Sequence, residues 1–250
     1  MKLMRSCGLL ICIVAIVACT GFADEEKVHP ERMPDDYEWS MWIAPSTPPG
    51  DQFETYADRL ASSLPALHLL AETGVLSPTL DILHAHAQLI LHVLEGTDGP
   101  HANLVLFVPG ETVTNLLAPL RASLDILERT NSRHNSGIVY MKGGLLWVID
   151  WALPQLDAYA REIYRDSTPQ YLQARAVGNM IQYLMLQARD SAIACIEATD
   201  MGSAAQHLLQ TSAFLFAALG SPFSPQTKPV AGMGLYFLTH NLLGWAWFGS

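Results

Sequence analysis

The residues with the greatest chemical potential in this sequence are histidines, and four of them fall within residues 80–101. The stretch reads LDILHAHAQLILHVLEGTDGPH and is otherwise largely apolar. On a helix, residues three or four apart share a face, so His84 and His92 align through Gln88. His86 points to another side, and no two of the histidines stand four residues apart, the spacing that presents two imidazoles to one metal ion. The stretch therefore carries no metal motif confined to its own helix.

A metal ion could still be held between two helices. Residues 73–76 predict a tight turn between two antiparallel helices, which places His68 at the level of Asp81 and His84. Together with His92, these residues are the candidate ligands for a divalent metal, because zinc, copper and nickel accept imidazole nitrogen and zinc also accepts carboxylate oxygen. The pattern favours the alternative of a helix with one half-exposed polar face, whose imidazoles form hydrogen bonds to neighbouring carboxylates.

Other catalytic patterns are missing from the sequence. It contains no nucleophile elbow, phosphate loop, dinucleotide fingerprint or haem attachment site. Asp150 and Asp157 could serve as an acid and a base, but their spacing is typical of the solvated face of a helix. Cys195 lies in an apolar helical context without a basic neighbour, so we expect a buried, unreactive thiol. The sequence predicts no catalytic residue.

The balance of charge bears on the class of partner. The chain of 250 residues has 14 Lys and Arg against 24 Asp and Glu, a formal net charge of -10. Nucleic-acid binding needs clustered basic residues that displace counterions, and the chain has no basic run. We therefore exclude nucleic acid as a partner. We expect an envelope protein or a small apolar ligand instead.

The amino terminus predicts export. Lys2 and Arg5 precede an apolar run of signal-peptide length, and residues 16–19 read IVAC, the pattern of a bacterial lipobox. Residues 1–18 are then a signal peptide, and lipid on the Cys19 thiol would attach the protein to a membrane of the cell envelope. The alternative is simple secretion after cleavage behind Ala23.

Helical periodicity predicts an all-α, up-and-down bundle of about six helices. Residues 19–50 are acidic and rich in proline, as expected for an extended tether, and residues 51–220 form the bundle domain. Pro65 should kink or divide the first helix, and Ser77 should cap the second. The expected helices cover residues 51–72, 77–96, 111–130, 137–165, 167–201 and 203–219.

Residues 221–250 form an apolar C-terminal segment. Within it, residues 230–248 contain no charged side chain, so their length alone would permit a membrane span. Three glycines and a Thr-His-Asn sequence favour a helix packed over the bundle or lying at a membrane interface.

One stretch resembles a known group. Residues 86–100 are similar to a helix-ending motif of uncharacterised exported helical proteins of bacteria. Leu89 and His92 stand where the motif has a second His and an Asn. The resemblance implies an exported helical bundle and brings no activity with it. The matching residues are His86, Ala87, Glu95, Gly96, Gly99 and Pro100.

These observations leave three functional hypotheses. The favoured one is an exported, lipid-anchored helical module that binds a partner or ligand in the cell envelope. The second is a metal-binding or metal-delivery protein that uses His68, Asp81, His84 and His92. The third is an envelope enzyme whose site assembles from scattered helices.

Overall fold

A computed structural model describes residues 47–96, 99–101, 143–220 and 233–245. All of them belong to one compact unit of the chain, Trp39–Ser250. The predicted signal peptide, Cys19, nearly all of the tether and the helix expected at 111–130 lie outside the described residues. Within the described residues all regular structure is helical, which confirms the all-α prediction.

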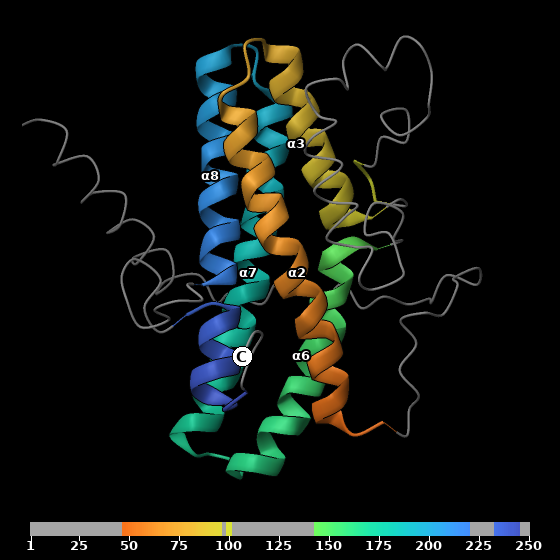
Figure 1. The fold of residues 1–250 in the computed structure, drawn as a ribbon, viewed down its shortest axis with the longest axis vertical. Coiled ribbons are helices and arrows are strands. Elements are labelled where there is room, and N and C mark those ends of the chain that lie inside the picture. Colours follow the sequence, from red (N-terminus) through yellow and green to blue (C-terminus); the bar gives the residue numbers. More distant parts are fainter. Residues whose placement is uncertain (1–46, 97–98, 102–142, 221–232, 246–250) are drawn as a thin grey trace, which may run out of the picture. The chain divides into compact units, whose positions relative to one another are not determined.

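Two long helices carry the bundle. Helix α2 spans Pro49–Val75 and α7 spans Pro169–Glu197, and each packs against several shorter helices. Helix α3, Leu80–Glu95, is followed in the same column by α6, Gly144–Tyr164. Helix α8, Met201–Leu219, is followed by a π-helical segment, η3, Phe237–Leu242, as Figure 1 shows. The chain thus runs up and down as predicted, with two of the four columns built from stacked pieces.

Glycines allow these pieces to stack closely. Gly144 begins α6 with φ +58, and a Cβ on it would lie 2.3 Å from the carbonyl oxygen of Leu94 and 2.4 Å from the nitrogen of Gly96. Gly220 and Gly234 similarly bring the end of α8 against the start of the C-terminal segment. Only a residue without a side chain permits such approach of two backbones.

Local signals fix most of the helix ends. Thr168 caps α7 by accepting a hydrogen bond from the Tyr171 nitrogen, with Pro169 in the first turn, as predicted. One prediction was wrong in detail, because Thr79, not Ser77, caps α3. Of the two outcomes expected at Pro65, division of the helix does not occur, since α2 runs through this residue. Packing along the whole length of α2 outweighs the hydrogen bond that a proline removes.

The C-terminal segment is anchored by aromatic contacts. The Tyr164 hydroxyl donates to the carbonyl of Leu242, and the ring of Trp245 lies 5.4 Å from that of Phe53 and 5.9 Å from that of Tyr159. Within residues 233–245, the described part of this segment, the chain therefore packs over the bundle with a short helix at Phe237–Leu242. None of the helices in the described residues combines the length and apolar character needed to cross a membrane.

Candidate functional site

The structure does not bring the four candidate metal ligands together. His84 Nε2 lies 3.1 Å from the carbonyl oxygen of Ala198, at the end of α7, whereas His68 faces α8. Asp81 is exposed in the first turn of α3 and His92 is buried further along it. Across the described residues, no three His, Cys, Asp or Glu side chains gather in a group that could hold a metal ion. The predicted α2–α3 turn exists, but the faces of the two helices meet different neighbours.

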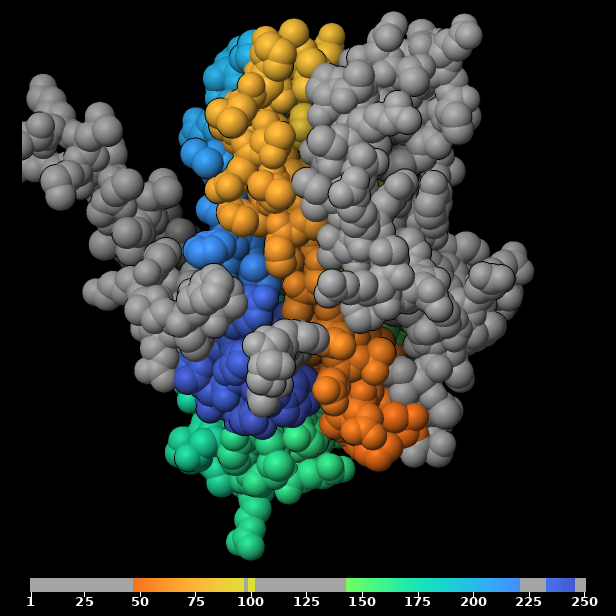
Figure 2. All heavy atoms as spheres, viewed as in Figure 1, coloured from red at the N-terminus to blue at the C-terminus, as the bar shows by residue number. Residues whose placement is uncertain are grey.

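His68 instead lines an open groove between α2 and α8. The groove has a volume of about 300 Å³ and lies between α2 and α8, two helices in close contact whose atoms lie against one another in Figure 2. Helix α2 contributes two polar side chains one turn apart, and α8 contributes four residues spaced along one of its faces. The lining residues are His68, Glu72, Leu209, Ser212, Ala213 and Phe216.

A hydrogen-bonded clasp joins the two helices at the floor of the groove. His68 Nδ1 lies 2.9 Å from the Ser212 hydroxyl and 3.2 Å from the Ser212 carbonyl oxygen. His68 Nε2 lies 3.6 Å from a carboxylate oxygen of Glu72. The imidazole also packs in a tilted arrangement against the ring of Phe216, with the ring centroids 5.2 Å apart. Either neutral tautomer is satisfied, since Nδ1 can accept from the hydroxyl or donate to the carbonyl.

The order Ser212, His68, Glu72 invites comparison with a catalytic triad, but the geometry does not support nucleophilic catalysis. Ser212 is only 3% exposed and lies in the interior of α8. Its neighbouring backbone N–H groups donate within the helix, so no pair of them is directed at the hydroxyl to stabilise an oxyanion. The clasp therefore holds α2 and α8 together and positions the imidazole in the groove.

Apolar side chains are exposed in the groove and close to it in the sequence. Leu209, which lines it, is 56% exposed. Leu69, which follows His68 on α2, is 44% exposed, and Leu76, the residue that follows the end of α2, is 83% exposed. Exposed apolar side chains that cluster beside a groove are typical of a surface that binds another molecule.

A second polar cluster explains the motif at the end of α3. The buried Glu95 carboxylate accepts hydrogen bonds from the His101 backbone nitrogen at 3.0 Å and lies 2.9 Å from His101 Nδ1. Gly99 passes so close that a Cβ on it would lie 2.4 Å from the Glu95 Cβ. Glu95 and Gly99 thus shape the return of the chain from the helix. This role is structural, and the sequence analysis did not foresee the Glu95–His101 pair.

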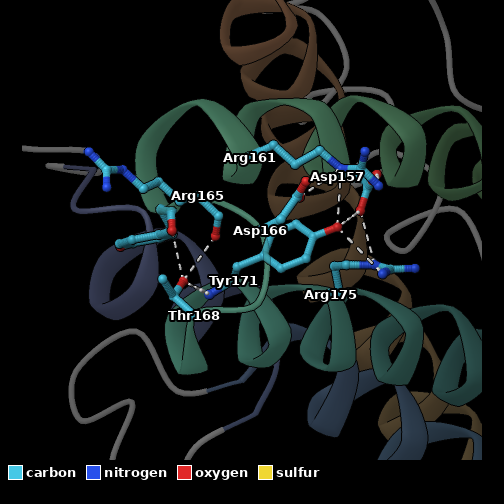
Figure 3. A network of polar contacts seen from close by, with 8 residues as sticks. Asp157, Arg161, Arg165, Asp166, Thr168, Tyr171 and Arg175 are labelled. Atoms are coloured by element: carbon cyan, nitrogen blue, oxygen red, sulfur yellow. Dashed lines mark hydrogen bonds and ion pairs between the residues drawn. The ribbon is translucent and has the colours of Figure 1, made fainter.

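A third cluster fixes the corner between α6 and α7, shown in Figure 3. Asp157 accepts from the Tyr171 hydroxyl at 2.8 Å and forms ion pairs with Arg161 and Arg175, at 3.0 and 2.9 Å. The two guanidinium groups lie 5.8 and 5.6 Å from the centre of the Tyr171 ring. Asp157 was expected to be simply solvated, but it organises this network. Both arginines contact Asp157 and Tyr171, and these contacts stabilise the α6–α7 corner.

Three titratable groups that are buried or half-buried lie elsewhere. Asp150, also expected in solvent, accepts a hydrogen bond from Gln182, and burial raises the pKa of its carboxyl. Burial lowers the pKa of His86, whose Nδ1 donates to the Ile82 carbonyl at 2.8 Å. Burial raises the pKa of the Cys195 thiol to about 11, and the thiol is inaccessible, as predicted. None of these groups lines the groove.

Comparisons with known proteins leave the site to be interpreted from its own geometry. The chain matches no family model, and no curated protein and no solved structure matches it significantly.

Proposed function

We propose that this chain is an exported, lipid-anchored helical module of the bacterial cell envelope that binds a partner through the α2–α8 groove. The lipobox ending at Cys19 supports the location, and the groove supports the binding role. The observation that carries the proposal is the exposure of Leu209 in an open groove, together with the exposed Leu69 and Leu76 on or next to the helix that carries His68 and Glu72. Water-exposed leucines beside a concave surface gain free energy when a partner covers them.

The shape of the groove favours a protein segment over an enclosed small molecule. Small-molecule sites usually bury most of the ligand in a cleft of about 300–1,000 Å³. This groove lies at the lower end of that range and is open along its length. An open groove between two helices suits a partner that inserts one or two apolar side chains and lies across the rest.

Site-specific photocrosslinking in living bacteria tests the binding role. A photoreactive residue replaces Ala213, which is exposed in the groove. We expect a discrete adduct that disappears when Leu209→Gln is added. A photoreactive residue at Gln170, exposed at the α6–α7 corner, is the matched control. Equal labelling at both positions, or an adduct indifferent to Leu209→Gln, would remove the groove as the binding site.

Labelling with a radioactive fatty acid tests the location. The full chain should take up label in a bacterium that processes lipoproteins, and Cys19→Ala should abolish the labelling. Release of an unlabelled wild-type chain into the medium would instead favour the secreted alternative.

A further inference from the structure

We propose that the partner segment is a basic amphipathic helix, an inference that rests on the groove being the binding site. The reasoning starts from the distribution of charge along the two helices that form it. No Lys or Arg occurs at residues 60–101 or 190–220. These ranges include the second half of α2, all of α3 and all of α8. The walls of the groove therefore present no positive side chain except a histidine.

Carboxylates gather at the same end of the bundle. Glu72 lines the groove and is 55% exposed. Asp81 is exposed in the first turn of α3, and Glu197 and Asp200 are exposed at the α7–α8 turn. The α2–α3 and α7–α8 turns lie together at the top of Figure 1. Leu209 is nine residues from Asp200, about 14 Å along the helix. The groove thus opens beside an acidic end.

The arginines of the described residues lie elsewhere. Arg161, Arg165 and Arg175 surround the α6–α7 corner, at the opposite end in Figure 1, and Arg59 is buried. Arg189, on α7, is ion-paired with its neighbour Asp190 at 2.7 Å and does not line the groove. Charges of one sign around a low-dielectric groove attract a partner of opposite sign and speed its association. A partner that carries Lys or Arg beside its apolar face complements this surface.

The spacing of the exposed leucines fits a helical partner. Leu209 and the half-buried Phe216, both lining the groove, are seven residues apart on α8, and the exposed Leu69 of α2 is seven residues from Leu76, which follows the end of that helix. A helix that docks through the positions i, i+3, i+4 and i+7 repeats its anchors at the same interval of about 10.5 Å. Other occupants fit less well. Anionic lipid headgroups would be repelled, and a second copy docked through the same face would bring Glu72 carboxylates together.

Binding of synthetic peptides to the purified full-length chain tests the inference. One peptide repeats Leu and Lys in a pattern that forms an amphipathic helix, a second has Glu in place of every Lys, and a third has Gln in place of every Leu. Fluorescence anisotropy measures each affinity. We expect the Leu/Lys peptide to bind at least about tenfold more tightly than either of the others, and more weakly as salt is added.

Variants of the chain locate the contact. Glu72→Gln should weaken the Leu/Lys peptide about two- to fivefold, as expected for one exposed charge contact. Leu209→Gln should weaken it about fivefold or more. Glu162→Gln removes an exposed carboxylate at the opposite end and is the matched control, with no expected change.

The remaining outcomes separate this inference from the binding role itself. Equal binding of the Leu/Glu peptide, still lost in Leu209→Gln, would overturn the basic partner and leave the groove as the site. The inference would be overturned if neither Glu72→Gln nor Leu209→Gln changed the affinity for the Leu/Lys peptide. It would also be overturned if none of the three peptides bound. Two further experiments test other occupants of the groove. A dimer of the chain alone in sedimentation, abolished by Leu209→Gln, would overturn the inference. Flotation of the chain with anionic vesicles, abolished by the same substitution, would also overturn it. In each of these cases the crosslinking at Ala213 still decides independently whether the groove binds a partner.

Discussion

A double-mutant cycle on His68 and Ser212 would show whether the clasp is structural. Ser212→Ala removes the hydroxyl that lies 2.9 Å from His68 Nδ1 but keeps the backbone carbonyl at 3.2 Å. The imidazole therefore retains one partner, so we expect the free energy of unfolding to fall by about 1 kcal/mol, the contribution of one hydrogen bond. His68→Ala should lower the free energy of unfolding more, by about 2 kcal/mol, because the contact with the Phe216 ring is also lost.

The decisive quantity is the coupling between the two substitutions. Urea unfolding of the single and double variants should give a coupling free energy of about 0.5–1.5 kcal/mol. Thr211→Ser, at the residue before Ser212, is a control for helix perturbation, because the Thr211 hydroxyl donates to the carbonyls of His207 and Ala188, on α8 and α7, and not to α2. Coupling near zero would mean that His68 and Ser212 do not interact in solution. Labelling of the folded chain by a fluorophosphonate, abolished in Ser212→Ala, would refute our view that Ser212 is not a nucleophile.

Three further predictions concern packing and protonation. Gly144→Ala should lower the free energy of unfolding by about 2–4 kcal/mol, because residue 144 has a positive φ and its new Cβ would lie 2.3 Å from the Leu94 carbonyl oxygen. Gly202→Ala is the control and should change the free energy little, since its Cβ would meet only a side-chain oxygen at 3.2 Å. Calorimetry measures both variants. Because burial lowers the pKa of His86 in the folded chain, the unfolded chain binds its proton more readily, so the free energy of unfolding should fall as the pH drops below 6.5, and less steeply in His86→Leu. Because the pKa of the Cys195 thiol is about 11, only about one molecule in a thousand carries a thiolate there at about pH 8. Thiol reagents should therefore label Cys195 only when the chain unfolds. Rapid labelling of Cys195 in the folded chain would contradict its burial.

The helices were predictable because their signals are local. Thr168 and Pro169 begin α7, and Gly96 and Gly220 end α3 and α8 with positive φ, all within a few residues of the predicted ends. The error at Ser77 has the same local origin. Thr79, two residues later, also follows the turn and carries a side-chain oxygen that accepts from the Ile82 nitrogen. Propensity alone does not distinguish the two caps.

The site was not predictable, because periodicity shows which residues share a face but not which helix that face meets. His68 was expected to meet α3 across the nearby turn, but its partner Ser212 is 144 residues away in the sequence. The polar stripe of α3 shows the same limit. It runs from the exposed Asp81 through the half-buried His84 to the buried His92, because the start of α6 stacks against the end of α3.

The groove itself has a signal in the sequence that becomes interpretable only beside the structure. Helix α8 contains no Asp, Glu, Lys or Arg, yet Leu209 and Ala213 are exposed on it. A solvent-facing helix normally carries charge on its outer face, so an uncharged one is unusual unless another molecule covers that face. Between the large side chains of Leu209 and Phe216 lie the small Ser212 and Ala213, which leave the space that becomes the groove. An uncharged outer face that alternates large and small side chains therefore supports the proposed binding role of α8 together with α2, because a partner would cover apolar side chains that are now in contact with solvent.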